Sequence, residues 1–335
     1  MAWVTFALSG ITIILAGTKL SQYGDRIAEY SGLGRLWIGV VLLAAATSLP
    51  EMLTAVSAVL IDAPNLAVGD LFGAGLTNML TLALIDLAHR TKRVWEQTAL
   101  DQALIASLAV IMTGLAGLLI MVRPSLPLLH VGLGTIAIAV IYLFGMRLVF
   151  RQESMRRRAE QLQRVVQRKE TVSHTVAKGS LMRAGFGFAM ATVGILIAAP
   201  LLAESAMQIA ETTGISSTFI GTSLVAIVTS LPEMVTAFAA VRLGAFDLAV
   251  GNLFGSNAFN MGILVIADMA YWKGPLLAGV DTTHAVTAFV SILLMSVGIM
   301  GIIYRAEKRF LFIEPDSALM IVGYLLGIGL IYSLG

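Results

Sequence analysis

The sequence contains no cysteine and few charged residues. Of its 335 residues, 13% are charged and 58% are hydrophobic. Without cysteine, neither a disulfide framework nor a thiolate metal site can form. The four histidines are far apart in the chain, which argues against a histidine metal cluster. A mean hydropathy of +0.88 exceeds what a soluble core of this size needs. The composition therefore predicts an all-α polytopic membrane protein.

Long apolar segments divide the chain. A helix that crosses the bilayer needs about 20 mostly apolar residues. Ten segments meet this requirement: 2–20, 36–60, 66–88, 99–121, 127–149, 182–204, 216–241, 246–271, 279–303 and 317–334. The first lacks a basic leader and an obvious cleavage site, so we interpret it as a retained helix rather than a signal peptide.

Positive charge is distributed unevenly across these ten segments. If they alternate in direction, 20 of the 22 lysines and arginines fall on one side, and only Arg123 and Lys273 fall on the other. The positive-inside rule makes the basic side cytoplasmic, so both termini are expected outside. The polar stretch 151–180 is then a cytoplasmic basic linker between a first unit, 1–150, and a second unit, 181–335. A solvated linker is the simpler interpretation of this stretch, and a contact with anionic lipid or a regulatory contact is the alternative. No nucleic-acid motif accompanies the charge.

The two units share a repeated motif. The nine residues from Thr47 to Ala55 recur from Thr229 to Ala237 with eight identities, an offset of 182 residues. A second block, 66–73, recurs at 248–255 with seven of eight identities at the same offset. The repeat motifs span 44–78 and 226–260. A constant offset indicates duplication. Because each unit holds five helices, an odd number, the second unit is expected to be inverted, as in many secondary transporters.

Each motif places a glutamate, Glu51 or Glu233, inside an apolar segment. An ionised carboxylate there costs at least about 2.5–3.5 kcal/mol, so each glutamate is expected to face the interior of the helix bundle and to need a counter-charge. No lysine or arginine lies near either glutamate in the four motif helices. A bound cation is one way to neutralise the charge, and a protonated, hydrogen-bonded glutamate is the alternative.

Oxygen atoms surround the glutamates in sequence. The prolines that precede them, Pro50 and Pro232, each remove a backbone N–H and so free a carbonyl inside the segment. Hydroxyl groups lie three and four residues earlier, on nearly the same helix face: Thr47, Ser48, Thr229 and Ser230. A single hydroxyl of this kind often bonds only its own helix backbone. Oxygen ligands suit hard cations such as Ca²⁺ and Na⁺.

Glycines and asparagines mark the second block of each motif. Glycines at four-residue spacing often mean only close helix packing, and here close packing would let Asn78 and Asn260 approach the glutamates. The acidic residues Asp86, Asp247 and Asp268 lie toward predicted helix ends and are interpreted as caps or vestibule charges. Asp70 is the most plausible exception.

The motifs ATSLPE and VTSLPE, followed by GDLFGAGLTN and GNLFGSNAFN, resemble the signatures of the cation/Ca²⁺ exchanger superfamily, prokaryotic sodium/calcium exchanger type. The resemblance covers the ten-helix plan as well as the motifs. It implies a four-helix core with four central cation sites, beside which the first and sixth helices slide to alternate access. It also implies the inner (plasma) membrane of a prokaryote.

The resemblance also implies roles for individual residues. Glu51 and Glu233 would be the central acidic ligands, and Asn78 and Asn260 would occupy the remaining corners. The other implied ligands, by side chain or carbonyl, lie on the two flanks of this centre: Ala44, Thr47 and Ser48 on one flank, and Ala226, Thr229, Ser230 and Ser256 on the other.

Two departures from the family pattern stand out. Ala74 replaces the serine expected in the first repeat, whereas Ser256 keeps it in the second. Asp70 stands where asparagine is more usual, and Asn260 stands where some prokaryotic relatives have aspartate. These changes put stoichiometry and driving ion in question.

The function expected is exchange of Ca²⁺ for Na⁺ by alternating access. The alternatives are coupling to H⁺ or K⁺, transport of another divalent cation, and a passive channel with the same acidic residues. An enzyme is not expected, because no nucleophile with a positioned base is evident. No cofactor and no obligatory protein partner are expected; the partners are the transported ions and the lipid bilayer.

Overall fold

A computed structural model describes residues 1–30, 43–88, 101–124, 127–128, 130–166, 178–304 and 315–334. Helices dominate these ranges, since a helix satisfies its backbone hydrogen bonds internally, as lipid requires. The helices of the first half are α1 (Ala2–Tyr30), α3 (Leu43–Thr47), α4 (Leu49–Leu60), α5 (Pro64–Ala88), α7 (Asp101–Val122) and α8 (Leu133–Val166). A short antiparallel hairpin, β1 (Pro127–Leu128) and β2 (Val131–Gly132), precedes α8, with Pro127 opposite Gly132.

The second half follows a similar order. Its elements are α9 (Lys178–Thr213), α10 (Ser217–Ile220), the π-helical turn η2 (Gly221–Val225), α11 (Ala226–Thr229), α12 (Leu231–Arg242), α13 (Phe246–Ala270), α14 (Leu276–Gly279), α15 (Thr283–Tyr304) and α16 (Pro315–Leu334).

Several helices are long and apolar enough to cross a membrane. Within the described residues there are eight, or nine if the pair Ser217–Thr229 and Leu231–Arg242, which is bent by 44°, counts as one span. The predicted segment 36–60 lies partly outside the described residues, and its described part forms α3 and α4. The prediction of an all-α polytopic membrane protein agrees with this arrangement.

Helix boundaries recur at the offset seen in the sequence. The helices α4, α5 and α7 begin and end 182 residues before α12, α13 and α15, and α8 begins 182 residues before α16. The duplication therefore extends well beyond the two short motifs, to helices whose sequences show no obvious similarity.

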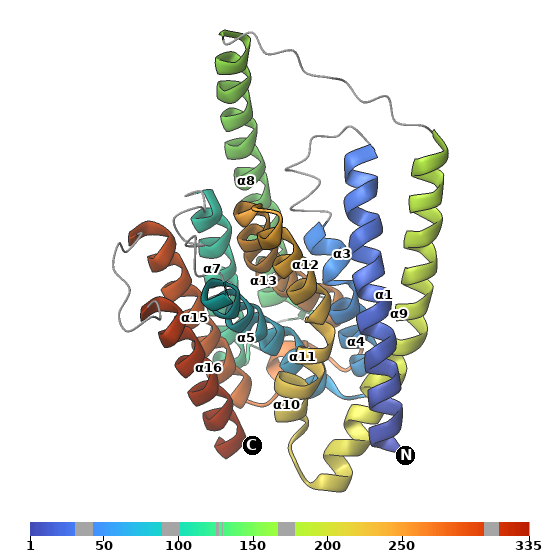
Figure 1. Cartoon of the computed structure of the whole chain (residues 1–335). Coiled ribbons are helices and arrows are strands. Elements are labelled where there is room, and N and C mark those ends of the chain that lie inside the picture. Colours follow the sequence, from blue (N-terminus) through green and yellow to red (C-terminus); the bar gives the residue numbers. More distant parts are fainter. Residues whose placement is uncertain are drawn as a thin grey trace.

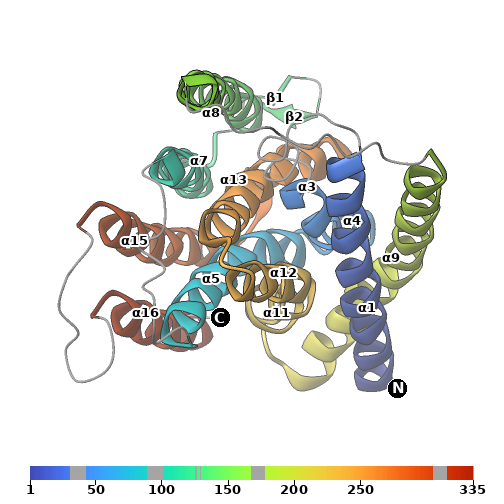
Figure 2. The same ribbon diagram turned by 45° about the horizontal axis from the view of Figure 1, so that its top comes forward.

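Two helices form the centre of the molecule. In their most apolar windows, 78% of α5 and 72% of α13 are buried, whereas the figure for α8 is 17%. The helix α5 contacts α4, α13 and η2, while α13 contacts α4 and α12. Figure 2 shows α1 and α9 on one side of this group and α15 and α16 on the other. The helices α4, α5, α12 and α13 thus form a core with the other helices around it.

The first and last helices place both ends of the chain at the same end of the molecule (Figure 1). At the opposite end, α8 extends far beyond the other helices. The predicted linker 151–180 is therefore partly helical: α8 continues to Val166 and α9 begins at Lys178. This continuation is consistent with the arginine, glutamine and glutamate content of the segment, because these residues favour helix. Similarly, α1 and α9 continue past the predicted ends at 20 and 204, since a helix need not stop where its apolar stretch stops.

Candidate cation site

The helix is broken within each repeat motif. Ser48 separates α3 from α4, and Ser230 separates α11 from α12, with nearly the same backbone angles (φ −85° and ψ 10°; φ −85° and ψ 1°). The following prolines, Pro50 and Pro232, lie in the first turn of α4 and α12, where a missing N–H costs no helical hydrogen bond. The prolines were expected to free a carbonyl within one apolar segment; in the structure they mark a break between two helices.

The glutamates also lie in the first turns of these helices. Glu51 is in the first turn of α4 and Glu233 in the first turn of α12, and both side chains are fully buried. The positive end of a helix dipole stabilises a carboxylate at this position. Each helix break thus places a carboxylate at the start of a helix and in the core of the protein.

The serines and glutamates of the two motifs are cross-connected. Ser48 Oγ donates to Glu233 Oε1 at 3.0 Å, and Ser230 Oγ donates to Glu51 Oε1 at 3.0 Å. Each serine therefore bonds the glutamate of the other repeat rather than its own. Ser256 Oγ adds a longer contact of 3.5 Å to Glu233 Oε1. The two repeats meet at this pair of reciprocal hydrogen bonds.

One oxygen atom of each glutamate carboxylate has no hydrogen-bond partner. Glu51 Oε2 and Glu233 Oε2 are buried without a hydrogen bond, and within the described ranges no lysine or arginine pairs with either glutamate. The two carboxylates are also close enough to interact electrostatically. Buried carboxylate oxygens without donors are costly. A cation between them would supply the missing charge and the missing contacts.

The asparagines form a second polar layer. Asn78 Nδ2 donates to Asn257 Oδ1 at 2.8 Å, and both residues are buried. Asn78 Oδ1 and both polar atoms of the buried Asn260 have no partner. Free amide oxygens of this kind can coordinate a hard cation. Asn78 and Asn260, both named from the sequence, therefore place amide oxygens without hydrogen-bond partners in the core. Asn257 lies beside them and bonds to Asn78.

The threonines differ between the repeats. Thr229 Oγ1 lies 2.9 Å from Asp70 Oδ1 and also contacts the carbonyls of Val225 and Ala226 at 3.1 and 3.3 Å. Its counterpart Thr47 is also fully buried but lies within hydrogen-bonding reach of Glu233. Ala226 begins α11, and Ala44 lies in α3. The hydrogen-bond partners of the two threonines therefore differ between the two flanks of the site.

Other acidic residues are held by ordinary structural contacts. Asp268 is fully buried and accepts hydrogen bonds from Thr135 and from the backbone N–H groups of Gly132 and Leu276 at 2.9 and 2.6 Å. Asp86 accepts from Ser317 at 2.6 Å. Both are thus tied to loops or to other helices, and their interpretation as caps or vestibule charges stays a prediction. Asp70, the exception, is fully buried beside Thr229.

Glycines allow helices to touch near the glutamates. A methyl group on Gly73 of α5 would lie 2.3 Å from the carbonyl oxygen of Thr222, so the α5 backbone packs directly on η2. A methyl group on Gly17 of α1 would lie 2.5 Å from Pro232 Cγ and 3.5 Å from Pro50 Cγ. The helix α1 therefore crosses both broken segments at close range.

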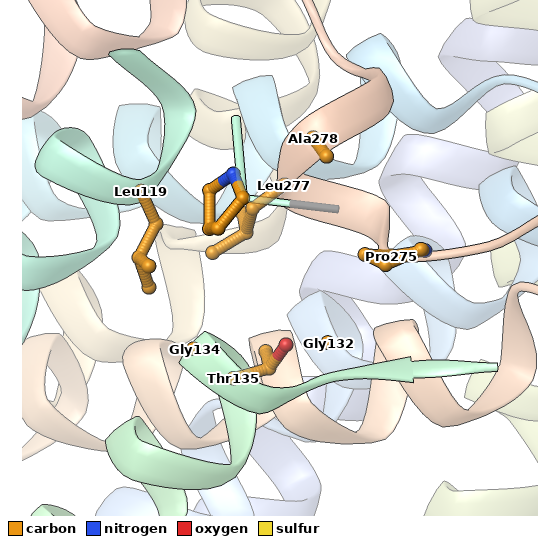
Figure 3. Close-up of a pocket in the computed structure, with 8 residues that line it drawn as sticks. Leu119, Gly132, Gly134, Thr135, Pro275, Leu277 and Ala278 are labelled. Carbon is orange, nitrogen blue, oxygen red and sulfur yellow. The ribbon is translucent and has the colours of Figure 1, made fainter. Parts of the chain in front are cut away.

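The site is closed in this structure. The side chains of Thr47, Ser48, Glu51, Asn78, Thr229, Ser230, Glu233, Ser256 and Asn260 are all fully buried. Figure 3 shows a crevice that lies elsewhere, between α7, the start of α8 and α14, with a volume of about 10 Å³. In the described part of the chain, no three histidine, aspartate or glutamate side chains converge as a metal cluster. Any cation here would depend on hydroxyl, amide and carbonyl oxygens together with the two glutamates.

Three features were not anticipated from the sequence. The crossed serine bonds require knowledge of how the repeats pack. Asn257 has Gly75 as its counterpart, so the duplicated pattern did not single it out, although comparison at the 182-residue offset would have flagged this difference. The π-helical turn η2 has no local sequence signal.

The chain matches the family model described as "Sodium/calcium exchanger protein" over residues 1–148 and 184–333. It is similar to the Inner membrane protein YrbG of Escherichia coli, with 28% identity over 76% of this chain and 75% of that protein. It is also similar to the Sodium/calcium exchanger MaX1 of Methanosarcina acetivorans, with 38% identity over 26% of this chain and 25% of that one.

Solved structures of the sodium-calcium exchanger NCX_Mj have a similar fold. For the crystal soaked with 2.5 mM Na⁺ and 0.1 mM Ca²⁺, the TM-score is 0.62 at 19% identity, over 98% of this chain and 97% of that chain. At this identity the likeness concerns the fold alone.

Proposed function

Because this chain belongs to the sodium/calcium exchanger family, we propose that it is a secondary antiporter that exchanges Ca²⁺ for Na⁺ by alternating access. The crossed bonds of Ser48 to Glu233 and of Ser230 to Glu51 carry the proposal. They bring two buried carboxylates from opposite repeats together while one oxygen of each remains without a donor. This arrangement supports a site for cations.

The charges of the pair suit exchange. Two ionised glutamates balance one Ca²⁺, or an equivalent set of Na⁺ ions and protons. Because Ca²⁺ and the Na⁺ ions would bind the same carboxylates, they cannot occupy the site together. This mutual exclusion couples the Ca²⁺ flux to the Na⁺ flux. The serine hydroxyls that now donate to the carboxylates can rotate to offer lone pairs to an ion. The ions are substrates, and the proposal needs no resident cofactor.

The proposed architecture has ten spans in two inverted five-helix repeats. The constant offset of the helix bounds supports it. In the proposed cycle, α1 and α9 move together across the core. Their mutual packing and the close approach of Gly17 to both motif prolines support this motion. We further propose that the basic loops face the cytoplasm of a prokaryotic cell and that both termini face outward.

A flux measurement on purified protein in sealed vesicles tests the exchange. With Na⁺ trapped inside and radiolabelled Ca²⁺ outside, uptake should follow the outward Na⁺ gradient and stop when the gradient is collapsed. Uptake should saturate with Ca²⁺. Uptake that is indifferent to Na⁺ would reject Na⁺ coupling, and non-saturating flux that follows the membrane potential alone would indicate a channel.

A second candidate is exchange driven by H⁺ or K⁺, or exchange of another divalent cation. Ala74 favours it, because this buried residue offers no hydroxyl where its counterpart Ser256 contacts Glu233. The flank of Glu51 therefore has one oxygen fewer for Na⁺. Replacing the Na⁺ gradient by a pH or K⁺ gradient in the same vesicles distinguishes the candidates.

A further inference from the structure

A groove lies between α1 and α9, which pack side by side (Figure 1). Its volume is about 500 Å³. The apolar part of its wall consists of Leu15 and Ala16 from α1 and of Phe186 and Met190 from α9. Leu15, Phe186 and Met190 are exposed at the surface of the protein. Exposed apolar side chains on helices that cross a membrane face lipid, so the groove opens to the bilayer.

Cationic side chains gather at one end of this groove. Lys19 and Arg183 line it, and the guanidinium of Arg26 lies 5.8 Å from the ring centroid of Tyr23, which lines it as well. Within the described residues, neither Lys19 nor Arg183 pairs with a carboxylate, and Lys19 Nζ bonds to the side-chain oxygen of Gln22 at 3.3 Å. We call the end near Arg26 and Arg183 the charged end of the groove. Its positive charge is available to an anion from outside the protein.

Charge and apolar surface are separated along the groove. Arg183 lies one helical turn before Gly187, where a methyl group would overlap the ring of Tyr23, and Met190 lies nearly one turn after it. The helix therefore rises about 10 Å from Arg183 to Met190, and the hydrocarbon of one leaflet is about 15 Å thick. A headgroup at the charged end would thus place its acyl chain beside the apolar wall.

Lys19 reaches the groove from a deeper level of α1. It precedes Tyr23 by four residues, so it lies about one turn further from the charged end. Its bond to Gln22, three residues later in α1, points toward that end. Lysine side chains commonly extend in this way along apolar surface toward polar groups. An ammonium group in this position favours an anion that enters from the headgroup region of the bilayer.

These features together match an anionic phospholipid. A basic pocket between membrane helices is a typical setting for anionic headgroups, and an acyl chain would cover the exposed apolar wall. A soluble anion would use only the cations and would leave this wall uncovered. A zwitterionic lipid would bring its own cation to the charged end and would gain less from it. The groove therefore fits a ligand with a negative headgroup and an apolar tail.

We propose that one anionic phospholipid binds between α1 and α9, with its phosphate at Lys19, Arg26 and Arg183 and an acyl chain against Leu15 and Met190. The lipid belongs to the leaflet on the basic side of the membrane. It spans the contact between the two helices that are proposed above to move together, and so holds them as a pair. The binding itself does not depend on the exchange function.

The test is lipid binding to the purified protein in detergent, counted by native mass spectrometry during titration with phosphatidylglycerol or with phosphatidylcholine of the same acyl chains. Wild type should bind its first phosphatidylglycerol about tenfold or more tightly than phosphatidylcholine. A cation near a headgroup is expected to contribute about fivefold in affinity. Lys19→Gln and Arg183→Gln should therefore each weaken phosphatidylglycerol binding about fivefold, and the double variant should weaken it about 25-fold.

The matched control is Arg242→Gln, which also removes one positive charge. Arg242 is exposed in the last turn of α12 and does not line the groove, so this variant should bind phosphatidylglycerol as wild type does. A second variant leaves all three cations in place. Met190→Trp adds bulk at an exposed position of the apolar wall, and it should weaken phosphatidylglycerol binding without any change in charge.

Three results would overturn the proposal. The first is that phosphatidylglycerol binds no more tightly than phosphatidylcholine. The second is that Arg242→Gln weakens binding as much as Lys19→Gln or Arg183→Gln, which would mean general attraction to a basic surface. The third is that equimolar glycerol 3-phosphate displaces the lipid, which would make a soluble phosphate the ligand.

The test remains decisive if one variant does not fold. Should the double variant fail size-exclusion chromatography, the single variants and Met190→Trp decide the question. Because binding is measured without an ion gradient, its outcome is separate from that of the exchange proposal.

Discussion

The contact between α5 and η2 predicts a large effect of a single methyl group at Gly73. In Gly73→Ala, the new methyl group would lie 2.3 Å from the Thr222 carbonyl oxygen, 2.6 Å from Thr222 Cα and 2.7 Å from Ala226 Cβ. Two of these atoms are backbone, so no side-chain rotation relieves the overlap. The helices must separate where the cation site forms.

The magnitude follows from two opposing effects. Overpacking a well-filled core costs about 1–3 kcal/mol, whereas replacing glycine by alanine within a helix gains about 0.5–1 kcal/mol. The matched control is Gly329→Ala in α16, where an added methyl group meets nothing within 4 Å. We expect Gly73→Ala to melt below wild type and to lose most Ca²⁺ uptake, and Gly329→Ala to melt at or above wild type with normal uptake.

The assay is thermal unfolding of both variants in the same detergent, followed by vesicle flux. If Gly73→Ala melts no lower than Gly329→Ala and transports normally, the close approach of α5 and η2 is not important for the site. Loss of uptake at an unchanged melting temperature would instead place the effect in ion binding alone.

Three further outcomes are expected. Ser230→Ala should raise the apparent KM for Ca²⁺ more than Ser48→Ala, because Glu233, which accepts from Ser48, keeps its contact with Ser256. For Ser230→Ala we expect a loss of about 1.5–3 kcal/mol of binding free energy, or tenfold or more in affinity. Equal or reversed effects in the two variants would contradict the crossed hydrogen bonds. Ala74→Ser should lower the Na⁺ concentration needed for half-maximal exchange, and an unchanged Na⁺ dependence would show that the missing hydroxyl is irrelevant. Gly17→Val should slow exchange without weakening equilibrium Ca²⁺ binding in detergent, because a side chain added at this position would begin 2.5 Å from Pro232 Cγ. Wild-type turnover would contradict a role for this contact in transport.

The duplicated motif predicted several features that the structure contains. Pro50 and Pro232 predict an interrupted backbone hydrogen bond inside each apolar segment, and the helices are broken just before them, at Ser48 and Ser230. A glutamate without a nearby basic residue predicts burial in the protein interior, and Glu51 and Glu233 are fully buried. These predictions hold because both depend on local chemistry: the missing N–H of proline, and the cost of placing a carboxylate against lipid.

Other features depend on how distant segments pack and could not be predicted. Whether Ser48 bonds its own glutamate or Glu233 depends on the crossing of the two broken helices, which no local pattern specifies. The contact of Thr229 with Asp70 likewise joins residues that are 159 apart in the chain. The ends of α8 and α9 were misplaced because hydropathy reports the apolar stretch of a helix, not the hydrogen bonds that extend it to Val166 or Thr213.

Glu51 and Glu233 are proposed to form one exchange site. The most direct measurement compares Na⁺-gradient-driven Ca²⁺ uptake in vesicles containing wild type, Glu51→Gln or Glu233→Gln, each verified as folded by size-exclusion chromatography. We expect saturable uptake by wild type that ceases when the Na⁺ gradient is collapsed, and abolished or severely reduced uptake by both variants. Wild-type rates in both folded variants would contradict it.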